Sequence, residues 1–325
     1  MDMYQKRKIR AEKKMKSEDE KWFPKISISW FPGHMAKTMK QIEQDLKLVD
    51  IVIEILDARI PLSSQNPNVQ KLIANKKKII VLNKSDLANE KENIRWVNYF
   101  ANNHIPAILF NSTTQDDSSK VINKINEVME EERKRQELKG RNYKIARVMV
   151  IGIPNVGKSS FINRIANKTA MQVGNKPGVT KQKQWIRLAN NIELLDTPGV
   201  LWPKLGSEDV SLKLAYTGTI KSEVIDETEI AYNLTKFLLE NYRDNIIKRY
   251  KISKENVDKI LVNDELEENE RIVEIMNDIG KMRGAVQRGN TIDLDKTSRI
   301  ILSDFRSGNL GRITLERINL ERMEK

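Results

Sequence analysis

The chain of 325 residues contains no cysteine and only two histidines, and no run of apolar residues in it is long enough to cross a membrane. The absence of cysteine excludes disulfide bonds and zinc modules held by thiolates, and it is consistent with a reducing compartment. The first residues include no apolar core of signal-peptide length. We therefore expect a cytoplasmic protein that has no membrane partner.

Positive charge is in excess, with 57 Lys and Arg against 45 Asp and Glu, which gives a net charge of +12. This excess favours a polyanionic partner, and RNA rather than DNA is the expected one. Residues 1–25 hold nine Lys and Arg, five acidic residues and few apolar ones. They predict a flexible basic extension, although a solvated tail without a function is an equal alternative.

A phosphate-binding loop begins at Gly152 and ends at Ser159, with the spacing Gly-x-x-x-x-Gly-Lys-Ser. It follows the apolar run 147–151, which predicts a buried strand, and it precedes a segment with helical spacing. Its backbone N–H groups and the helix N-terminus favour a bound phosphate. Lys158 is predicted to reach the β and γ oxygens, and the Ser159 hydroxyl to bind Mg²⁺. Further predicted nucleotide contacts are Asn155, Val156, Gly157 and Ser160.

The run Asn83-Lys84-Ser85-Asp86 closes a second predicted strand and would select the base. The Asp86 carboxylate can accept hydrogen bonds from the ring N–H and the exocyclic amine of guanine. Adenine has neither donor, so such a site can discriminate by on the order of 10⁴-fold or more. Asn83 is predicted to join this loop to the phosphate loop, and the Lys84 stem to cover the base.

A third predicted strand, at residues 107–110, ends in Asn111 and Ser112. Because the two residues follow a strand end, their backbone amides are candidates to contact the guanine carbonyl oxygen.

The run Asp196-Thr197-Pro198-Gly199 is predicted to sense the γ-phosphate. Asp196 would hold Mg²⁺ through water, and the Gly199 N–H would bind the γ-phosphate. Thr180, in a turn-rich stretch, is the candidate switch threonine that completes the Mg²⁺ shell, and an ordinary loop threonine is the alternative. Val200 follows Gly199, where many GTPases carry the glutamine that orients the attacking water. Hydrolysis must therefore be slow or depend on another group.

The base-selecting run precedes the phosphate loop in this chain, whereas an ordinary P-loop GTPase has the opposite order. This order indicates a circular permutation. Together with Trp30-Phe31-Pro32-Gly33-His34-Met35 and Asp57-Ala58-Arg59, it resembles the ribosome biogenesis GTPase A family, whose members are bacterial GTPases of large-subunit assembly. The resemblance runs from about Ile28 through the C-terminal region.

The resemblance also implies roles for three residues. Val200 matches the hydrophobic residue that replaces the catalytic glutamine in this family. His34 occupies the position proposed to act in hydrolysis, and the alternative is a histidine that packs its turn or caps a helix. Asn155 matches an asparagine associated with K⁺ binding in related potassium-stimulated GTPases. The candidate catalytic residues are therefore His34, Lys158 and Thr180.

The expected fold is α/β, with a circularly permuted P-loop GTPase domain and a mainly parallel sheet over residues 26–205. Residues 206–325 are expected to form a small all-α domain that binds RNA or the ribosome, with helical spacing at 230–242, 257–280 and 296–305.

The sequence thus predicts a monomeric GTPase that assembles the large ribosomal subunit, with GTP, GDP and Mg²⁺ as ligands and K⁺ as a further candidate. It would bind the precursor and its rRNA in the GTP state and leave after hydrolysis. One alternative is a GTP-dependent factor that acts on another RNA such as tRNA. The other is a nucleotide-switched scaffold with little turnover.

Overall fold

The computed structural model describes residues 33–112, 117–140, 145–169, 185–188, 191–202, 205–220 and 225–318. These residues form two compact units. The sheet unit comprises the described residues up to 205 together with 217–220 and 311–318, and the helical unit comprises 206–216 and 225–310. The basic extension predicted at residues 1–25 lies outside the described residues.

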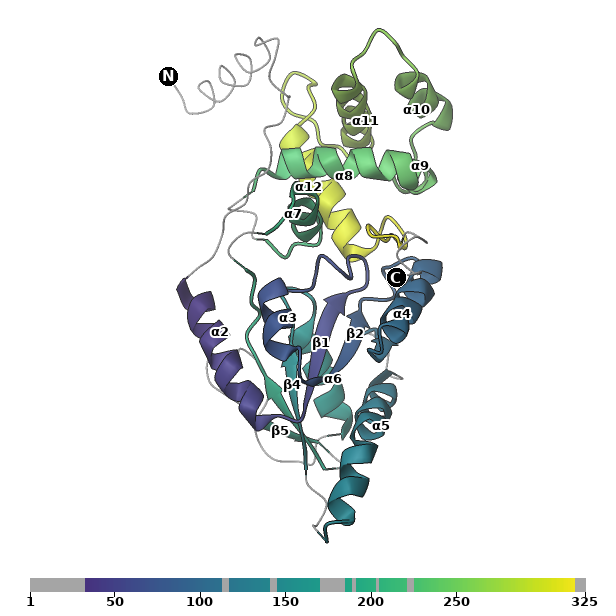
Figure 1. Ribbon diagram of the computed structural model, residues 1–325. Coiled ribbons are helices and arrows are strands. Elements are labelled where there is room, and N and C mark those ends of the chain that lie inside the picture. The colour runs from purple at the N-terminus through teal and green to yellow at the C-terminus, as the bar shows by residue number, and fades with distance from the viewer. Residues whose placement is uncertain are drawn as a thin grey trace. The chain divides into compact units, whose positions relative to one another are not determined.

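The sheet unit contains a six-stranded sheet in the order β3-β2-β1-β4-β6-β5 (Figure 1). Its strands are β1 (Ile51–Asp57), β2 (Lys77–Asn83), β3 (Ala107–Leu109), β4 (Ala146–Ile151), β5 (Trp185–Leu188) and β6 (Ile192–Asp196). Neighbouring strands are parallel except β5 and β6, which pair antiparallel. Every residue of β1 is buried, as expected for a central parallel strand with an almost continuous apolar run. The predicted mainly parallel sheet is confirmed.

Five α-helices accompany this sheet among the described residues, and two of them begin at asparagine caps. The helices are α2 (Gly33–Asp45), α3 (Pro67–Ile73), α4 (Glu90–Asn102), α5 (Asp117–Glu137) and α6 (Lys158–Thr169), and a short 3-10 helix, η1 (Leu46–Leu48), follows α2. The Asn66 side chain accepts hydrogen bonds from the first turn of α3, and Asn89 does the same for α4. These caps fix where the chain turns from the strand ends into the helices.

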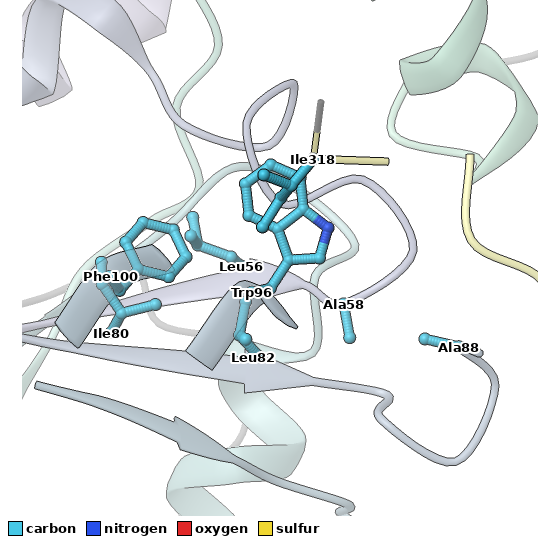
Figure 2. Close-up of a cluster of buried hydrophobic side chains, with 8 residues drawn as sticks. All are labelled: Leu56, Ala58, Ile80, Leu82, Ala88, Trp96, Phe100 and Ile318. Atoms are coloured by element: carbon cyan, nitrogen blue, oxygen red, sulfur yellow. The ribbon is translucent and has the colours of Figure 1, made fainter. Parts of the chain in front are cut away.

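Trp96 of α4 lies at the centre of one apolar cluster in the sheet unit (Figure 2). The other members are Leu56, Ala58, Ile80, Leu82, Ala88, Phe100 and Ile318. Ile318 lies beside the indole ring, although it is more than 200 residues away from Trp96 in the chain. The prediction that residues 206–325 form one helical domain therefore needs a correction. Residues 311–318 belong to the sheet unit, where Ile318 joins this cluster and Ile313 and Leu315 are also buried.

The helical unit consists of α-helices joined by short turns. They are α7 (Glu208–Tyr216), α8 (Glu227–Asn241), α9 (Arg243–Tyr250), α10 (Lys254–Leu261), α11 (Glu268–Met282) and α12 (Leu294–Ser307). The helical segment predicted at 257–280 is in fact parts of two helices, because a polar turn between Asn263 and Glu267 separates α10 from α11. Gly280 allows α11 to approach α12, since a Cβ there would lie 2.5 Å from Thr297 Oγ1.

No helix among the described residues is both long and apolar enough to span a membrane.

Glu54 is one of the buried carboxyl groups of the sheet unit. Glu54, in the middle of β1, is 2% exposed, and its Oε2 atom has no hydrogen-bond partner among the described residues. Burial raises the pKa of Glu54 from 4.5 to about 6, and the hydrogen bond from Gln70 and the charge of Lys78 oppose the rise only in part. The Glu54 carboxyl therefore binds its proton more tightly in the folded protein than in the unfolded chain.

The stability of a Glu54→Gln variant relative to the wild type should depend on pH. In the wild type, the contribution of Glu54 is fully present below pH 4.5 and is lost as pH rises through about 6. The variant lacks this group, so its stability relative to the wild type should rise by about 2 kcal/mol between pH 4.5 and pH 7. Urea unfolding of both proteins across this range measures the difference. A difference that is constant with pH would contradict the assignment.

Candidate nucleotide site

The predicted site residues follow the carboxyl ends of neighbouring parallel strands. Asp57 at the end of β1 is paired with Asn83 at the end of β2, and Asp196 at the end of β6 is paired with Val150 near the end of β4. Because these strands are parallel, their following loops meet at one edge of the sheet, which is where open α/β sheets bind ligands. The structure thus brings the base-selecting run, the phosphate loop and the Asp196 turn together.

The Asn83 side chain joins three loops. Its Nδ2 atom donates to the backbone oxygen of Val156 at 2.7 Å, and its Oδ1 atom accepts from the Ser112 hydroxyl at 3.0 Å. Gly157 makes this approach possible, because a Cβ at that position would collide with Asn83 Nδ2. The contact between Asn83 and the phosphate loop is the one expected from the sequence.

Lys84 connects the base side of the site to the phosphate loop through its ammonium group. Its Nζ atom lies 3.0 Å from Asp57 Oδ2 and 2.7 Å from the backbone oxygen of Asn155. The backbone of Lys84 is left-handed, with φ of 58°, which directs the side chain back across the strand ends. Lys84 is therefore an electrostatic link as well as a possible cover for a base.

Asp57 binds two cations at the edge of the site, and no individual role was predicted for it from the sequence. Its carboxylate is buried and accepts from the Arg59 backbone N–H at 3.0 Å, Arg59 Nε at 2.9 Å and Arg59 Nη2 at 2.8 Å. Burial alone would raise the pKa of Asp57, but the Arg59 and Lys84 cations outweigh it and hold the pKa well below its usual range. Asp57 therefore stays ionised and fixes both cations. The Asp57-Ala58-Arg59 segment contributed to the family resemblance, but nothing in the sequence around it predicted that the Asp57 carboxylate is buried.

The Asp86 carboxylate is half-buried, and no hydrogen bond or ion pair from the described residues reaches it. The preceding Ser85 is fixed, because its N–H and its hydroxyl both donate to the backbone oxygen of Phe110, at 3.2 and 3.0 Å. Asp86 thus follows a rigid turn and still has acceptor capacity for a ligand.

Backbone groups of Asn111 and Ser112, in the loop after β3, already form hydrogen bonds within the protein. The Asn111 backbone N–H, predicted to face the guanine carbonyl oxygen, instead donates to Asp117 Oδ2 at 2.9 Å. The backbone oxygen of Ser112 accepts two hydrogen bonds from the Arg164 guanidinium of α6, at 2.9 and 2.8 Å. Asp117 and Arg164 therefore hold this loop in place, and neither contact was predicted from the sequence.

Lys158 is the buried cation of the phosphate loop. Its Nζ atom donates to the backbone oxygens of Gly152 and Ile153, both at 3.0 Å. Burial lowers the pKa of Lys158 to about 8, while the charge of Asp196 opposes this shift. The ammonium group is therefore poorly compensated here, and an anionic phosphate would stabilise its charged form.

The rest of the phosphate loop offers further groups to a ligand. Ser159 and Ser160 are exposed in the first turn of α6, while Val156 is buried. Asn155 has a left-handed φ of 61°, and its side-chain nitrogen donates to the backbone oxygen of Gly218. Asn155 therefore links the phosphate loop to residues 217–220, which belong to the sheet unit although helical-unit segments precede and follow them.

The Asp196 turn lies directly against the phosphate loop. A Cβ at Gly199 would be 2.8 Å from Lys158 Nζ and 2.9 Å from the Pro154 nitrogen, so only glycine fits there. Val200 is buried, and its backbone oxygen accepts a hydrogen bond from Asn66 Nδ2 at 2.9 Å. An apolar, buried side chain after Gly199 cannot orient an attacking water.

The described part of the site fits Mg²⁺. Ser159 supplies a hydroxyl oxygen and Asp196 a carboxylate, and both are hard donors of the kind that Mg²⁺ prefers. The described residues hold no group of three or more acidic or histidine side chains that could bind a metal. Such a cage is not required, because Mg²⁺ at nucleotide sites takes its other ligands from phosphate and water.

Two predicted catalytic residues have no described side chain. Thr180 lies outside the described residues. His34 falls in the first turn of α2, of which the structure describes the backbone but not this side chain.

Several known proteins are similar to this chain in sequence or in fold. The profile of a family described as 50S ribosome-binding GTPase matches residues 147–278. The chain is 38% identical over 90% of its length to ribosome biogenesis GTPase A of Priestia megaterium, of which it covers 97%. It is 34% identical over 89% of its length to mitochondrial ribosome-associated GTPase 1 of Bos taurus, of which it covers 88%. GNP-bound YlqF from T. maritima is 26% identical with a TM-score of 0.59, over 86% of this chain and 98% of that one.

Binding of GDP should be accompanied by proton uptake at Lys158. The pKa of this group is lowered to about 8 in the free protein and should rise when phosphate lies beside it. At pH 8, calorimetry in two buffers of different ionisation enthalpy should show uptake of about half a proton, falling toward zero at pH 6.5. Equal proton exchange at both pH values would contradict this account.

Proposed function

The chain belongs to the ribosome biogenesis GTPase A family and is a GTPase, and on this premise we propose that it acts in assembly of the large ribosomal subunit. It binds the subunit precursor and its rRNA with GTP bound, and it leaves after hydrolysis. One observation carries the proposal: Asp86 and the phosphate loop converge at one sheet edge, and the chain runs from the turn at Gly199 directly into the helical unit at α7. A change at the γ-phosphate thus has a short covalent route to the helices.

In this proposal Asp86 reads guanine. Its carboxylate lies after a turn fixed by Ser85, and no described residue occupies it. Two guanine donors would pair with it, whereas adenine would leave it desolvated and unpaired. Lys84 covers the base, while its ammonium group stays on Asp57.

The phosphate loop and the Asp196 turn are the proposed binding groups for the phosphates and Mg²⁺. Lys158 and the N-terminus of α6 would hold the β- and γ-phosphates. Ser159, and Asp196 through water, would hold Mg²⁺, which would supply positive charge to the transferring phosphate. Thr180 would complete the Mg²⁺ shell, and Asn155 would bind K⁺. The Gly199 N–H would bind the γ-phosphate. This assignment is supported by the close approach of the Gly199 backbone to the phosphate loop, where a Cβ would lie 2.8 Å from Lys158 Nζ and 2.9 Å from the Pro154 nitrogen.

Val200 leaves the attacking water without an orienting amide, so this role needs another group. His34 is the proposed one, because a neutral imidazole is available near pH 7. It lies in the first turn of α2, before β1 in the chain.

Ribosomal RNA is the proposed partner for the helical unit. The relatives are named for ribosome biogenesis and ribosome association, and the matched family for 50S binding. Within the helical unit, Arg288 and Arg299 are exposed with no ion pair to a described residue. Such arginines can pair with phosphate groups of RNA.

Asp86→Asn should change which base is preferred. The amide replaces one acceptor with a donor, so GTP affinity should fall by on the order of a hundredfold. The same donor can face the C2 carbonyl of xanthine, so affinity for xanthosine triphosphate should increase. Competition titrations against a fluorescent GDP derivative measure both values. Unchanged relative affinities for GTP, ATP and xanthosine triphosphate would refute the base-reading role.

The partner is tested by sedimentation of cell extract in the presence of a non-hydrolysable GTP analogue, GDP or no nucleotide. We expect co-migration with immature large subunits when the analogue is bound and release with GDP. Absence from all ribosomal fractions would remove the proposal, and migration with tRNA-sized RNA would favour the alternative of another RNA substrate.

His34→Ala provides an internal comparison in the same gradients. If His34 acts in hydrolysis, this variant should bind GTP normally yet remain on the large subunit with ordinary GTP, as the wild type does with the analogue. Normal release would leave His34 with a packing role only.

A further inference from the structure

A segment at the end of the described chain contacts the base side of the nucleotide site. After α12 and its left-handed cap at Gly308, the chain returns to the sheet unit as residues 311–318, which we term the C-terminal strap. Its side chains Ile313, Thr314, Leu315 and Glu316 are all buried. It is therefore a packed part of the sheet unit.

The strap first contacts the loop that carries Asp86. The Ile313 backbone N–H donates to the backbone oxygen of Leu87 at 2.9 Å. The Thr314 hydroxyl accepts from the Asn89 backbone N–H, also at 2.9 Å, and the Thr314 side chain is fully buried. These contacts lie one and three residues beyond Asp86, so they fix the chain on its exit from the base-reading run.

The strap then contacts the loop after β1. The Leu315 N–H donates to the backbone oxygen of Arg59 at 2.9 Å. The Glu316 carboxylate accepts from the Leu62 N–H at 2.7 Å, from the Ser63 N–H at 3.0 Å and from the Ser63 hydroxyl. Arg59 is the residue that holds Asp57, and Asp57 in turn holds Lys84.

Glu316 is also fixed from the other side, because its backbone oxygen accepts from the Trp96 indole N–H at 3.0 Å. Its carboxylate has three donors from one loop, and hydrogen bonds to a charged acceptor are the strong ones. No substrate atom is needed to explain these contacts. The strap contacts therefore hold the loop after β1, whose Asp57 pairs with Lys84, at a set distance from the segment that follows Asp86.

We propose that the C-terminal strap is a positioning element for guanine recognition and that Glu316 is its central positioning residue. The strap clamps the segment after Asp86 to the loop after β1, whose Asp57 holds Lys84, so loss of the clamp lets the base-reading carboxylate drift from guanine. The inference rests on the proposed guanine-reading role of Asp86. It also gives the end of α12 a covalent route to the base side of the site, separate from the route through Gly199.

The test uses the full-length chain with Glu316→Gln, in which an amide nitrogen must face the N–H donors of Leu62 or Ser63. The dissociation constants of GDP, inosine diphosphate and ADP are measured by displacement of a fluorescent GDP derivative. Inosine lacks the exocyclic amine, so the ratio of GDP to inosine diphosphate affinity reports the alignment of Asp86. We expect GDP affinity to fall about tenfold and this ratio to shrink toward one, with turnover at saturating GTP nearly unchanged.

Arg312→Ala is the matched control on the same segment. Its guanidinium makes an exposed ion pair with Glu90 at 3.2 Å, with side chains 53% and 77% exposed, and such pairs contribute little. Nucleotide affinities should stay within about twofold of the wild type.

Three outcomes separate the possibilities. If Glu316→Gln lowers the melting temperature but leaves the GDP to inosine diphosphate ratio intact, the strap is structural only and the proposal is overturned. If that variant does not fold, Thr314→Val, which removes the acceptor for Asn89 and keeps the side-chain shape, decides by the same ratio. If the wild type itself does not prefer GDP to ADP, the base-reading role of Asp86 fails, and the strap proposal falls with it.

Discussion

The side-chain amide of Asn83 is the contact on which the nucleotide site depends. It joins two loops that the permuted chain separates by 73 residues, and it holds the Ser112 loop through its oxygen. The absence of a side chain at Gly157 makes this possible. Asp57 adds a second, ionic layer, because it keeps Lys84 between the base side and the phosphate loop. The base-side and phosphate-side groups can act on one nucleotide only when these contacts hold their loops together.

The sequence predicted the strand ends and their ligands because each motif follows an apolar run whose end must lie at the sheet edge. Asn83, Asp86, Lys158 and Gly199 could be assigned in this way. The role of Asp57 could not, because the segment that contains it looks like an ordinary polar turn and its burial depends on register with β2. Asp117 and Arg164 were missed because their partners are backbone atoms of the loop after β3, and such contacts leave no pattern in the sequence.

The C-terminal boundary was the main error of fold prediction. Residues 311–318 carry alternating apolar side chains over too short a stretch to indicate a partner, and only tertiary packing against Trp96 shows where they belong. The turn between α10 and α11 was missed because apolar residues on either side keep an approximate helical spacing across it. The described structure leaves the His34 side chain and Thr180 as sequence-based proposals.

The path of the chain between the units bears on how the protein is made. Within the described residues it passes from one unit to the other after Leu205, Tyr216, Ile220 and Leu310, so the sheet unit is not contiguous in sequence. Translation therefore delivers the whole helical unit before the residues that complete the core around Trp96. A nascent chain can fold its six strands earlier, but the base side of its site stays unfinished until residue 318 has emerged. The clamp on the base-side loops can therefore form only after the helical unit has been made.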